Sequence, residues 1–297
     1  MKIRFWGVRG SIPAPGPEYV KYGGNTACIE VHTPKAQLLL DAGSGIREFG
    51  IETHARKEPV KLHLLISHTH WDHIMGFPFF KPAYTAGNEI HVYGPRQVHS
   101  GKSIEDVLAS QMDYSYFPVR SCEMLAKIAY HDLGEETFQI EDATIRTMFL
   151  NHPIYMLAYR IEAGGRTIVY SGDWEPYHAS LYDDGQPQGE KVEDWVPEQD
   201  QKFISFIQGV DLFISDAMYT MEEYNTEKKG WGHSTFDHNV SLAHRARVKR
   251  LALVHHEPIR TDQQMAQMEQ YAQQAAARYS DHKVEVFAAR EGMSVEI

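Results

Sequence analysis

LHLLISHTHWDH, residues 62–73, places three histidines and an aspartate directly behind an apolar run. The run 61–68 has the composition of a buried strand, and neither a strand nor a helix requires the spacing that follows it. On a turn leaving the strand, His68 and His70 can point to one side while Asp72 and His73 point to the other, so one short loop could hold two adjacent metal ions. Imidazole and carboxylate ligands suit zinc, manganese or iron, and the lack of a cysteine ligand argues against a purely structural zinc.

Four further residues end predicted strands and could complete such a site. They are Asp41 in QLLLDAG, His152 in ATIRTMFLNH, Asp173 in RTIVYSGD and His255 in RLALVHH. Taken singly, a polar residue at a strand end is more often a cap or a turn residue. Taken together they supply the missing ligands, because functional side chains at successive strand ends can meet at one edge of a rigid scaffold.

The rest of the chain is predicted to form two strand-rich halves, each with helices on its outer side. Predicted strands cover 2–7, 27–32, 37–43, 61–68, 89–94, 143–152, 155–163, 166–173, 211–217, 250–256 and 283–289, and predicted helices cover 103–112, 234–247 and 261–280. This order favours one domain, 1–297, of two sheets packed face to face and covered by helices, with halves of about 1–135 and 136–297. The acidic stretch 182–200 is expected to be a solvated loop, with a lid as the alternative.

Composition limits the function classes. The formal net charge of −11 and the pI of about 5.8 argue against a broad nucleic-acid footprint, which needs a basic face. Two cysteines, Cys28 and Cys122, are too few for a disulfide scaffold and fit a reducing compartment. The first residues contain no apolar stretch of signal-peptide length, and no run of about 18 apolar residues occurs. A cytoplasmic protein without membrane contact is expected.

The ordered set Asp41, HTHWDH, His152, Asp173 and His255 resembles the five motifs of the metallo-β-lactamase superfamily, over nearly the whole chain. The resemblance implies an α/β fold, the four-layer αββα sandwich, with two divalent ions, zinc favoured and manganese or iron as alternatives. One ion would bind His68, His70 and His152, and the other Asp72, His73 and His255. Asp173 and a hydroxide would bridge them, and Asp41 would orient the histidine loop.

Two adjacent divalent ions, about 3.5–4 Å apart, can activate water for hydrolysis but do not select the bond that is cut. Gly232-His233-Ser234-Thr235, downstream of DLFISDA (211–217), resembles the segments with which ribonuclease Z and related phosphodiesterases place a further histidine beside the metals. By that resemblance His233 contacts the phosphate or protonates the leaving oxygen and Asp216 orients it, although Asp216 stands where ribonuclease Z has a glutamate. The catalytic residues would be Asp72, His233 and Asp216. The alternative for His233 is a turn residue that begins a helix.

LALVHHEP and FWGVRGSIP also resemble segments of these phosphodiesterases, and the register after LALV selects His255 rather than His256 as the last ligand. Candidates for substrate contact are Trp71, Arg9 and His256. Trp71 could stack on a base or sugar or pack beneath its loop, and Arg9 could contact phosphate or face solvent.

His152 and Asp173 are 21 positions apart, which leaves no room between them for the tRNA-gripping arm of ribonuclease Z. Together with the acidic balance, this predicts a small phosphodiester substrate such as a cyclic phosphate, opened by a metal-bridging hydroxide, and little tRNA binding. The resemblance also suggests a homodimer. The alternatives are a lactonase or thioesterase on the same fold, or a metal-binding sensor without turnover.

Overall fold

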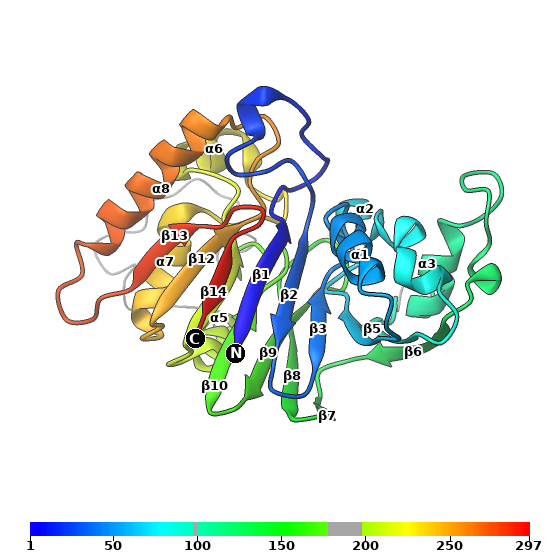
Figure 1. Cartoon of the computed structure of the whole chain (residues 1–297). Helices are drawn as coiled ribbons and strands as arrows, with labels where there is room; N and C mark the ends of the chain where they lie inside the picture. Colours follow the sequence, from blue (N-terminus) through cyan, green and yellow to red (C-terminus); the bar gives the residue numbers. More distant parts are fainter. Residues whose placement is uncertain (98–99, 178–197) are drawn as a thin grey trace.

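The computed structural model describes residues 1–97, 100–177 and 198–297. It arranges them in four layers, with two sheets packed face to face and helices on the outer side of each (Figure 1). The predicted αββα sandwich is confirmed. The acidic stretch 182–200 is predicted to be a loop or a lid. Its residues 182–197 lie outside the described residues.

In the part of the chain that the structure describes, each sheet has seven strands. The first sheet runs in the order β14 (Ser294–Glu296), β1 (Lys2–Gly7), β2 (Cys28–His32), β3 (Gln37–Leu40), β4 (Lys61–Leu65), β5 (Glu89–Pro95) and β6 (Lys127–Leu133). The second runs in the order β13 (Glu285–Ala288), β12 (Arg250–Val254), β11 (Leu212–Asp216), β10 (Arg166–Tyr170), β9 (Leu157–Ala163), β8 (Ala143–Phe149) and β7 (Thr137–Ile140).

The parallel parts of the sheets position the site. Strands β3 to β6 are parallel in the first sheet, and β10 to β13 are parallel in the second. The carboxyl ends of parallel neighbours lie at the same edge of a sheet, which is where open α/β sheets bind ligands. The segments after β3, β4, β10, β11 and β12 carry most of the residues that the sequence singles out.

Three hydrophobic clusters separate the layers. Between the sheets, side chains such as Phe5, Leu40 and Leu65 meet Ile161, Tyr170 and Ile214. The alternate side chains of the same strands face the helices, as the two-residue period of a strand requires. Helices α1 (Ile46–Ala55) and α3 (Ile104–Ser110) cover the first sheet. Helices α5 (Glu198–Ile207), α7 (Phe236–Arg245) and α8 (Asp262–Ala276) cover the second.

Short helical turns complete the connections. They are α2 (Trp71–Ile74), α6 (Met221–Glu223), the 3₁₀ turns Pro17–Tyr19, Phe77–Phe79, Lys81–Tyr84 and Ser121–Glu123, and the π-helical turn Tyr224–Lys228. The sequence analysis missed α1, although Ile46, Phe49, Gly50 and Thr53 form its buried stripe at helical spacing. Gly50 belongs to this stripe but contributes no apolar side chain to the sequence pattern, and it packs closely against Phe80 and Pro82.

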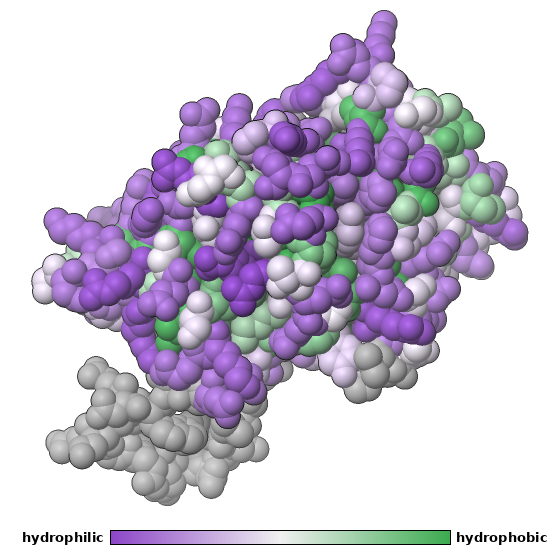
Figure 2. Space-filling view, turned by 90° about the horizontal axis from the view of Figure 1, so that it is seen from below, coloured by the Kyte–Doolittle hydropathy of each residue, from purple (hydrophilic) through white to green (hydrophobic). Residues whose placement is uncertain are grey.

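The last strand, β14, pairs with β1, so the C-terminal end of the chain completes the sheet of the N-terminal half. The chain passes from the first sheet to the second between β6 and β7, both of which the sequence analysis missed. Hydrophilic residues predominate on the face seen in Figure 2, with hydrophobic groups between them. Within the described residues, no helix combines the length and the apolar character needed to cross a membrane.

Candidate metal centre

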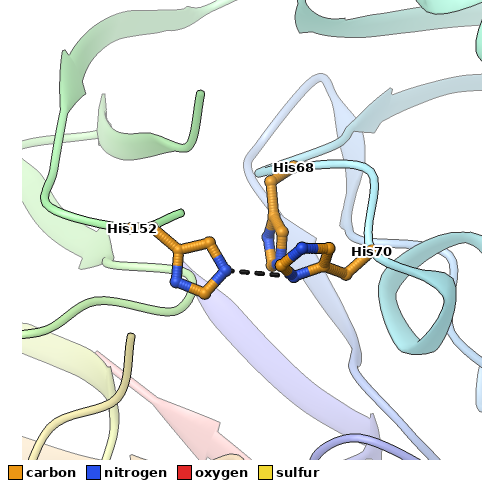
Figure 3. Close-up of side chains that lie close together, drawn as sticks. All are labelled: His68, His70 and His152. Atoms are coloured by element: carbon orange, nitrogen blue, oxygen red, sulfur yellow. Dashed lines mark hydrogen bonds between the residues drawn. The ribbon is translucent and has the colours of Figure 1, made fainter. Parts of the chain in front are cut away.

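Three imidazoles from two segments meet at one edge of the sandwich. His68 and His70 lie on the turn between β4 and α2, and His152 lies on the turn after β8 (Figure 3). His70 Nδ1 is 3.1 Å from His68 Nε2 and 3.0 Å from His152 Nε2. We call these residues the histidine triad. Two nitrogens bound to one tetrahedral zinc lie roughly 3.3–3.4 Å apart, so the triad has the spacing of a shared ligand set.

The second group contains Asp72, His73, Asp173 and His255, which we call the acidic quartet; all four are buried. Asp173 Oδ2 lies 3.1 Å from Nε2 of both His73 and His255, and 3.6 Å from His68 Nε2 in the triad. Asp72 Oδ2 is 3.1 Å from His255 Nε2. The turn after β4 thus contributes side chains to both groups. Asp173 belongs to the quartet and lies on the side that faces the triad.

Asp41 holds this turn in place from beneath. Its carboxylate accepts hydrogen bonds from the backbone N–H of Ser67 (2.6 Å), the hydroxyls of Ser67 and Tyr170 (2.8 and 2.6 Å) and Nδ1 of His73 (2.7 Å). Because His73 donates through Nδ1, its Nε2 is left to face Asp173. Partners of this kind fix the tautomer and ring orientation of metal-binding histidines.

Two further hydrogen bonds orient the centre. His152 Nδ1 donates to the carbonyl of Gly232 at 2.9 Å, which leaves Nε2 directed into the triad. The backbone N–H of Ser11 donates to Asp72 Oδ2 at 2.7 Å. The sequence analysis did not predict Ser11, Ser67 or Tyr170, because serine and tyrosine hydroxyls carry no spacing signal of their own.

The two groups differ in their electrostatics. Burial lowers the pKa of His68 and brings the pKa of His152 to about 3, so the triad offers neutral imidazoles. In the quartet, burial by itself would lower the pKa of His255, but Asp173 and Asp72 outweigh it and raise that pKa to about 10. The pKa of His73 is likewise raised, by Asp173, Asp72 and Asp41 against burial. The quartet therefore creates a negative potential that favours cations.

These observations fit metal ions. Each group offers nitrogen or oxygen atoms within 4.8 Å of one another, the donor set that zinc and neighbouring metals prefer. Among the described residues, the buried Asp173 Oδ1 and His255 Nδ1 have no hydrogen-bond partner. Asp173 and His255 could instead group with Asp216 and His233, so the geometry allows a second way of sharing these two ligands.

His233 and Asp216 lie beside the quartet. His233 Nδ1 donates to Asp216 Oδ2 at 3.1 Å, and the backbone N–H of Ser234 donates to the same oxygen at 3.1 Å. Burial raises the pKa of Asp216, although His233 opposes that shift. The His233 ring stacks on His255 at 4.8 Å between centroids. The imidazole is thus oriented by a buried carboxyl group and directs Nε2 away from it.

The three candidates for substrate contact have different positions. Trp71 is 79% exposed, on the turn that carries the ligands, and is accessible to a substrate. Arg9 is fully buried and donates to the carbonyls of Gly23, Glu257 and Arg260, so the prediction that it contacts phosphate is wrong. Through Nε and one terminal nitrogen this buried guanidinium links the loops that carry the three carbonyls, while its other terminal nitrogen has no hydrogen-bond partner among the described residues.

The prediction that His256 contacts substrate is also wrong. Its ring is fully buried, and Nε2 donates to the carbonyl of Ala289 at 2.9 Å. His255 has φ 60°, and this left-handed turn at the end of β12 directs the two neighbouring histidines to opposite sides. His255 therefore joins the quartet, whereas His256 packs against Tyr22.

Comparisons with known proteins agree with this architecture. The family model of the beta-lactamase superfamily domain matches residues 36–189, just over half of the chain. Ribonuclease Z of Ignicoccus hospitalis is 24% identical over 295 residues of alignment, gaps included. The alignment covers 86% of this chain and 88% of that protein.

Two solved structures have the same fold over the whole chain. The metallo-beta-lactamase fold protein YhfI from Bacillus subtilis superposes with a TM-score of 0.69 and 19% identity, covering 100% of this chain and 98% of that one. The short form of human tRNase Z superposes with a TM-score of 0.65 and 20% identity, covering 100% and 99%. At these identities the likeness establishes the fold.

Proposed function

The chain belongs to the beta-lactamase superfamily, and from this we infer that it is a metal-dependent hydrolase that cleaves a phosphodiester bond in RNA. The observation that carries the inference is the meeting of the histidine triad, the acidic quartet and the His233–Asp216 pair at one edge of the sandwich. The relatives that match most of the chain bear the name ribonuclease Z, which supports phosphodiester hydrolysis as the reaction.

This conclusion corrects the predicted partner. The expectation of a small-molecule substrate with little tRNA binding is wrong, because proteins named ribonuclease Z and tRNase Z match this chain along most or all of its length. Strands β9 and β10 fill the sequence between His152 and Asp173, so an arm is excluded at that place only. Net charge also sums over the whole surface, so it does not describe the local potential at which RNA would bind.

In the proposed centre, the triad would hold one divalent ion and Asp72, His73 and His255 would hold another, with Asp173 shared between them. Such ions supply charge stabilisation for the phosphate and lower the pKa of water towards neutrality. The protein's own residues then orient the ligands: Asp41 fixes His73, and the Gly232 carbonyl fixes His152.

His233 would donate a proton to the oxygen that leaves the phosphorus. Its Nδ1 is engaged with Asp216, so Nε2 is the nitrogen that can serve the substrate. Asp216 keeps the ring in that tautomer and stabilises its positive charge, the arrangement expected for a histidine acid. Asp216 is inaccessible to solvent, so in this role it would act through His233.

The test is cleavage of a labelled precursor RNA and of bis(p-nitrophenyl) phosphate by metal-reconstituted protein. Both should be cleaved, RNA more efficiently, and chelation should abolish both activities. His70→Ala should remove activity, whereas His54→Ala, an exposed histidine outside the centre, should not. Turnover of a lactone or thioester with no cleavage of either diester would overturn the proposal.

A further inference from the structure

Trp231 is an exposed indole on the loop that ends in His233. The described tryptophans fall into two classes: Trp6 and Trp174 are buried, whereas Trp71 and Trp231 are 79% and 57% exposed. Both exposed rings lie on segments that carry residues of the centre, since Trp71 follows His70 and Trp231 stands two positions before His233.

The loop is closed at its base. The N–H groups of Met218 and Tyr219 donate to the carbonyl of Ser234, at 3.1 and 3.3 Å, beside the His233–Asp216 hydrogen bond. The chain therefore leaves β11, passes through α6 and the π-helical turn, and returns to the point of departure. Trp231 lies on the returning segment, next to the centre.

A buried carboxylate fixes the backbone on both sides of Trp231. Glu175 accepts hydrogen bonds from the N–H groups of Gly230 (2.7 Å) and Gly232 (2.9 Å) and from the hydroxyl of Tyr224 (2.5 Å). The Gly232 carbonyl in turn accepts from His152 of the triad. The indole thus projects into solvent from a backbone that is attached directly to the metal centre, and its exposure is not a result of a loose loop.

A cation accompanies the ring. Lys228 Nζ lies 4.0 Å from the centroid of Trp231, close enough for a cation–π interaction. Because the ammonium lies over one face of the indole, a base would stack on the opposite face while the lysine neutralises a neighbouring phosphate. Aromatic rings and cations together bind single-stranded nucleic acid in this way.

We propose that Trp231 and Lys228 form a stacking platform for the base of a nucleotide next to the scissile phosphate of RNA. The proposal rests on the proposed function and adds the part of the substrate that is recognised. Stacking of one base on an aromatic side chain changes affinity by roughly 5- to 150-fold. Recognition through a ring face is tolerant of base identity, so the platform would select an unpaired nucleotide rather than a sequence.

The test compares Trp231→Ala and Trp231→Phe on a series of RNA substrates in which one base at a time is removed. With the metal-loaded enzyme, Trp231→Ala should raise KM for intact RNA by roughly 5- to 150-fold, and Trp231→Phe should retain most of the affinity. For one abasic substrate, wild-type protein should lose the same factor and Trp231→Ala should lose nothing further. Unchanged metal content in both variants would show that the centre is intact.

Fluorescence anisotropy of labelled RNA with chelator-treated protein gives a second readout, independent of turnover. Trp231→Ala should weaken binding by a similar factor, and Lys228→Gln should reduce the slope of log affinity against log salt by about 0.7. Tyr271→Ala, an exposed aromatic on α8, is the matched control and should change neither quantity.

The outcomes separate the two proposals. Wild-type protein that binds or cleaves RNA while Trp231→Ala behaves identically, or loses the same factor on intact and on every abasic substrate, overturns the platform alone. Wild-type protein that neither binds nor cleaves RNA overturns the proposed function and the platform with it.

Discussion

Two residues of the centre have backbone angles that side chains rarely adopt. Asp41 has φ 61° and His255 has φ 60°, both in the left-handed region. Such a conformation costs on the order of 1–3 kcal/mol and persists only where the surroundings determine it. Four hydrogen bonds hold Asp41 in this conformation, and contacts with Asp72 and His233 hold His255.

Asp173→Asn should reduce bound metal from about two ions per chain by at least one, and turnover should fall with it. The change keeps the shape of the side chain but removes the charge that faces both His68 of the triad and His73 of the quartet. Elemental analysis and diester hydrolysis measure the two effects, with Asp281→Asn as a matched exposed control. Unchanged metal content would contradict a shared role for Asp173.

His233→Ala should retain both metals and lose roughly 10²–10⁴-fold in rate, the usual contribution of a general acid. The loss should shrink with p-nitrophenolate as the leaving group, which needs little protonation, and Asp216→Asn should show the same dependence in weaker form. An equal loss with good and poor leaving groups would indicate phosphate binding instead. Loss of metal would identify His233 as a ligand.

His63→Gln should make the protein less sensitive to acid. Burial, with help from His91 and Lys61, lowers the pKa of His63 to about 4 in the folded state, whereas an unfolded histidine has a pKa of about 6.5. As the pH falls from 6.5 to 4, only the unfolded chain gains this proton, so the free energy of unfolding decreases by up to about 1.4 kcal/mol per pH unit.

Urea unfolding at several pH values, with chelator present, measures this slope. His63→Gln should reduce it relative to wild type, while the exposed control His54→Gln should leave it unchanged. Identical slopes for wild type and His63→Gln would show that another group accounts for the acid sensitivity.

At the scale of elements, the centre depends on connections rather than on the strands themselves. The turns after β4, β8 and β10 supply ligands, and the loop between β11 and α7 supplies His233 and the carbonyl that orients His152. This loop needs glycine at two positions, since Gly230 and Gly232 have φ 85° and 84°. They differ in their surroundings.

Gly232→Ala should weaken metal binding, whereas Gly230→Ala should not. Both substitutions force an L-residue into the left-handed region, at about 1–2 kcal/mol each. A Cβ at position 232 would also lie 2.7 Å from His152 Nδ1, whereas none of the described atoms lies within 4 Å of one at position 230. Thermal unfolding should show both losses, and metal titration should show a roughly 10- to 100-fold loss for Gly232→Ala only. Equal metal affinity in the two variants would contradict this coupling.

At the scale of the molecule, the two halves share one core. The cluster between the sheets contains residues from both, and β14 returns from the C-terminal end to pair with β1. We propose on this basis that residues 1–297 form a single cooperative domain, with sheets that correspond to halves of about 1–135 and 136–297 except for β14, which joins the first sheet. Neither half could expose its inner sheet face to water without losing the burial that stabilises it.

Calorimetry should therefore show one unfolding transition, with equal calorimetric and van't Hoff enthalpies. Added metal should raise its midpoint, because the ligands come from both sheets and binding to the folded state stabilises both halves together. Two transitions, or a midpoint shift confined to one of them, would contradict the single domain.

By itself the sequence determined the pattern of strands and the polar residues that follow them, and its resemblance to the metallo-β-lactamase superfamily implied the αββα sandwich that the structure confirms. Apolar runs of strand length ended in histidines and aspartates, and the parallel strands β3, β4, β10 and β12 bring such ends to one edge. His152 instead follows the antiparallel strand β8, so parallel pairing does not account for its position. Periodicity failed for α1, β6 and β7, which are short, interrupted by glycine or only half buried. Those elements owe their conformation to the surfaces on which they pack.

Only the tertiary structure decided where the side chains point. Arg9 and His256 belong to segments that resemble a phosphodiesterase site, yet both are buried against backbone carbonyls. Conversely, Glu175 and Tyr170 had no pattern to mark them, although they hold the Trp231 loop and Asp41. Sequence spacing specifies which residues follow a strand, whereas the direction of each side chain depends on backbone angles and on partners distant in the chain.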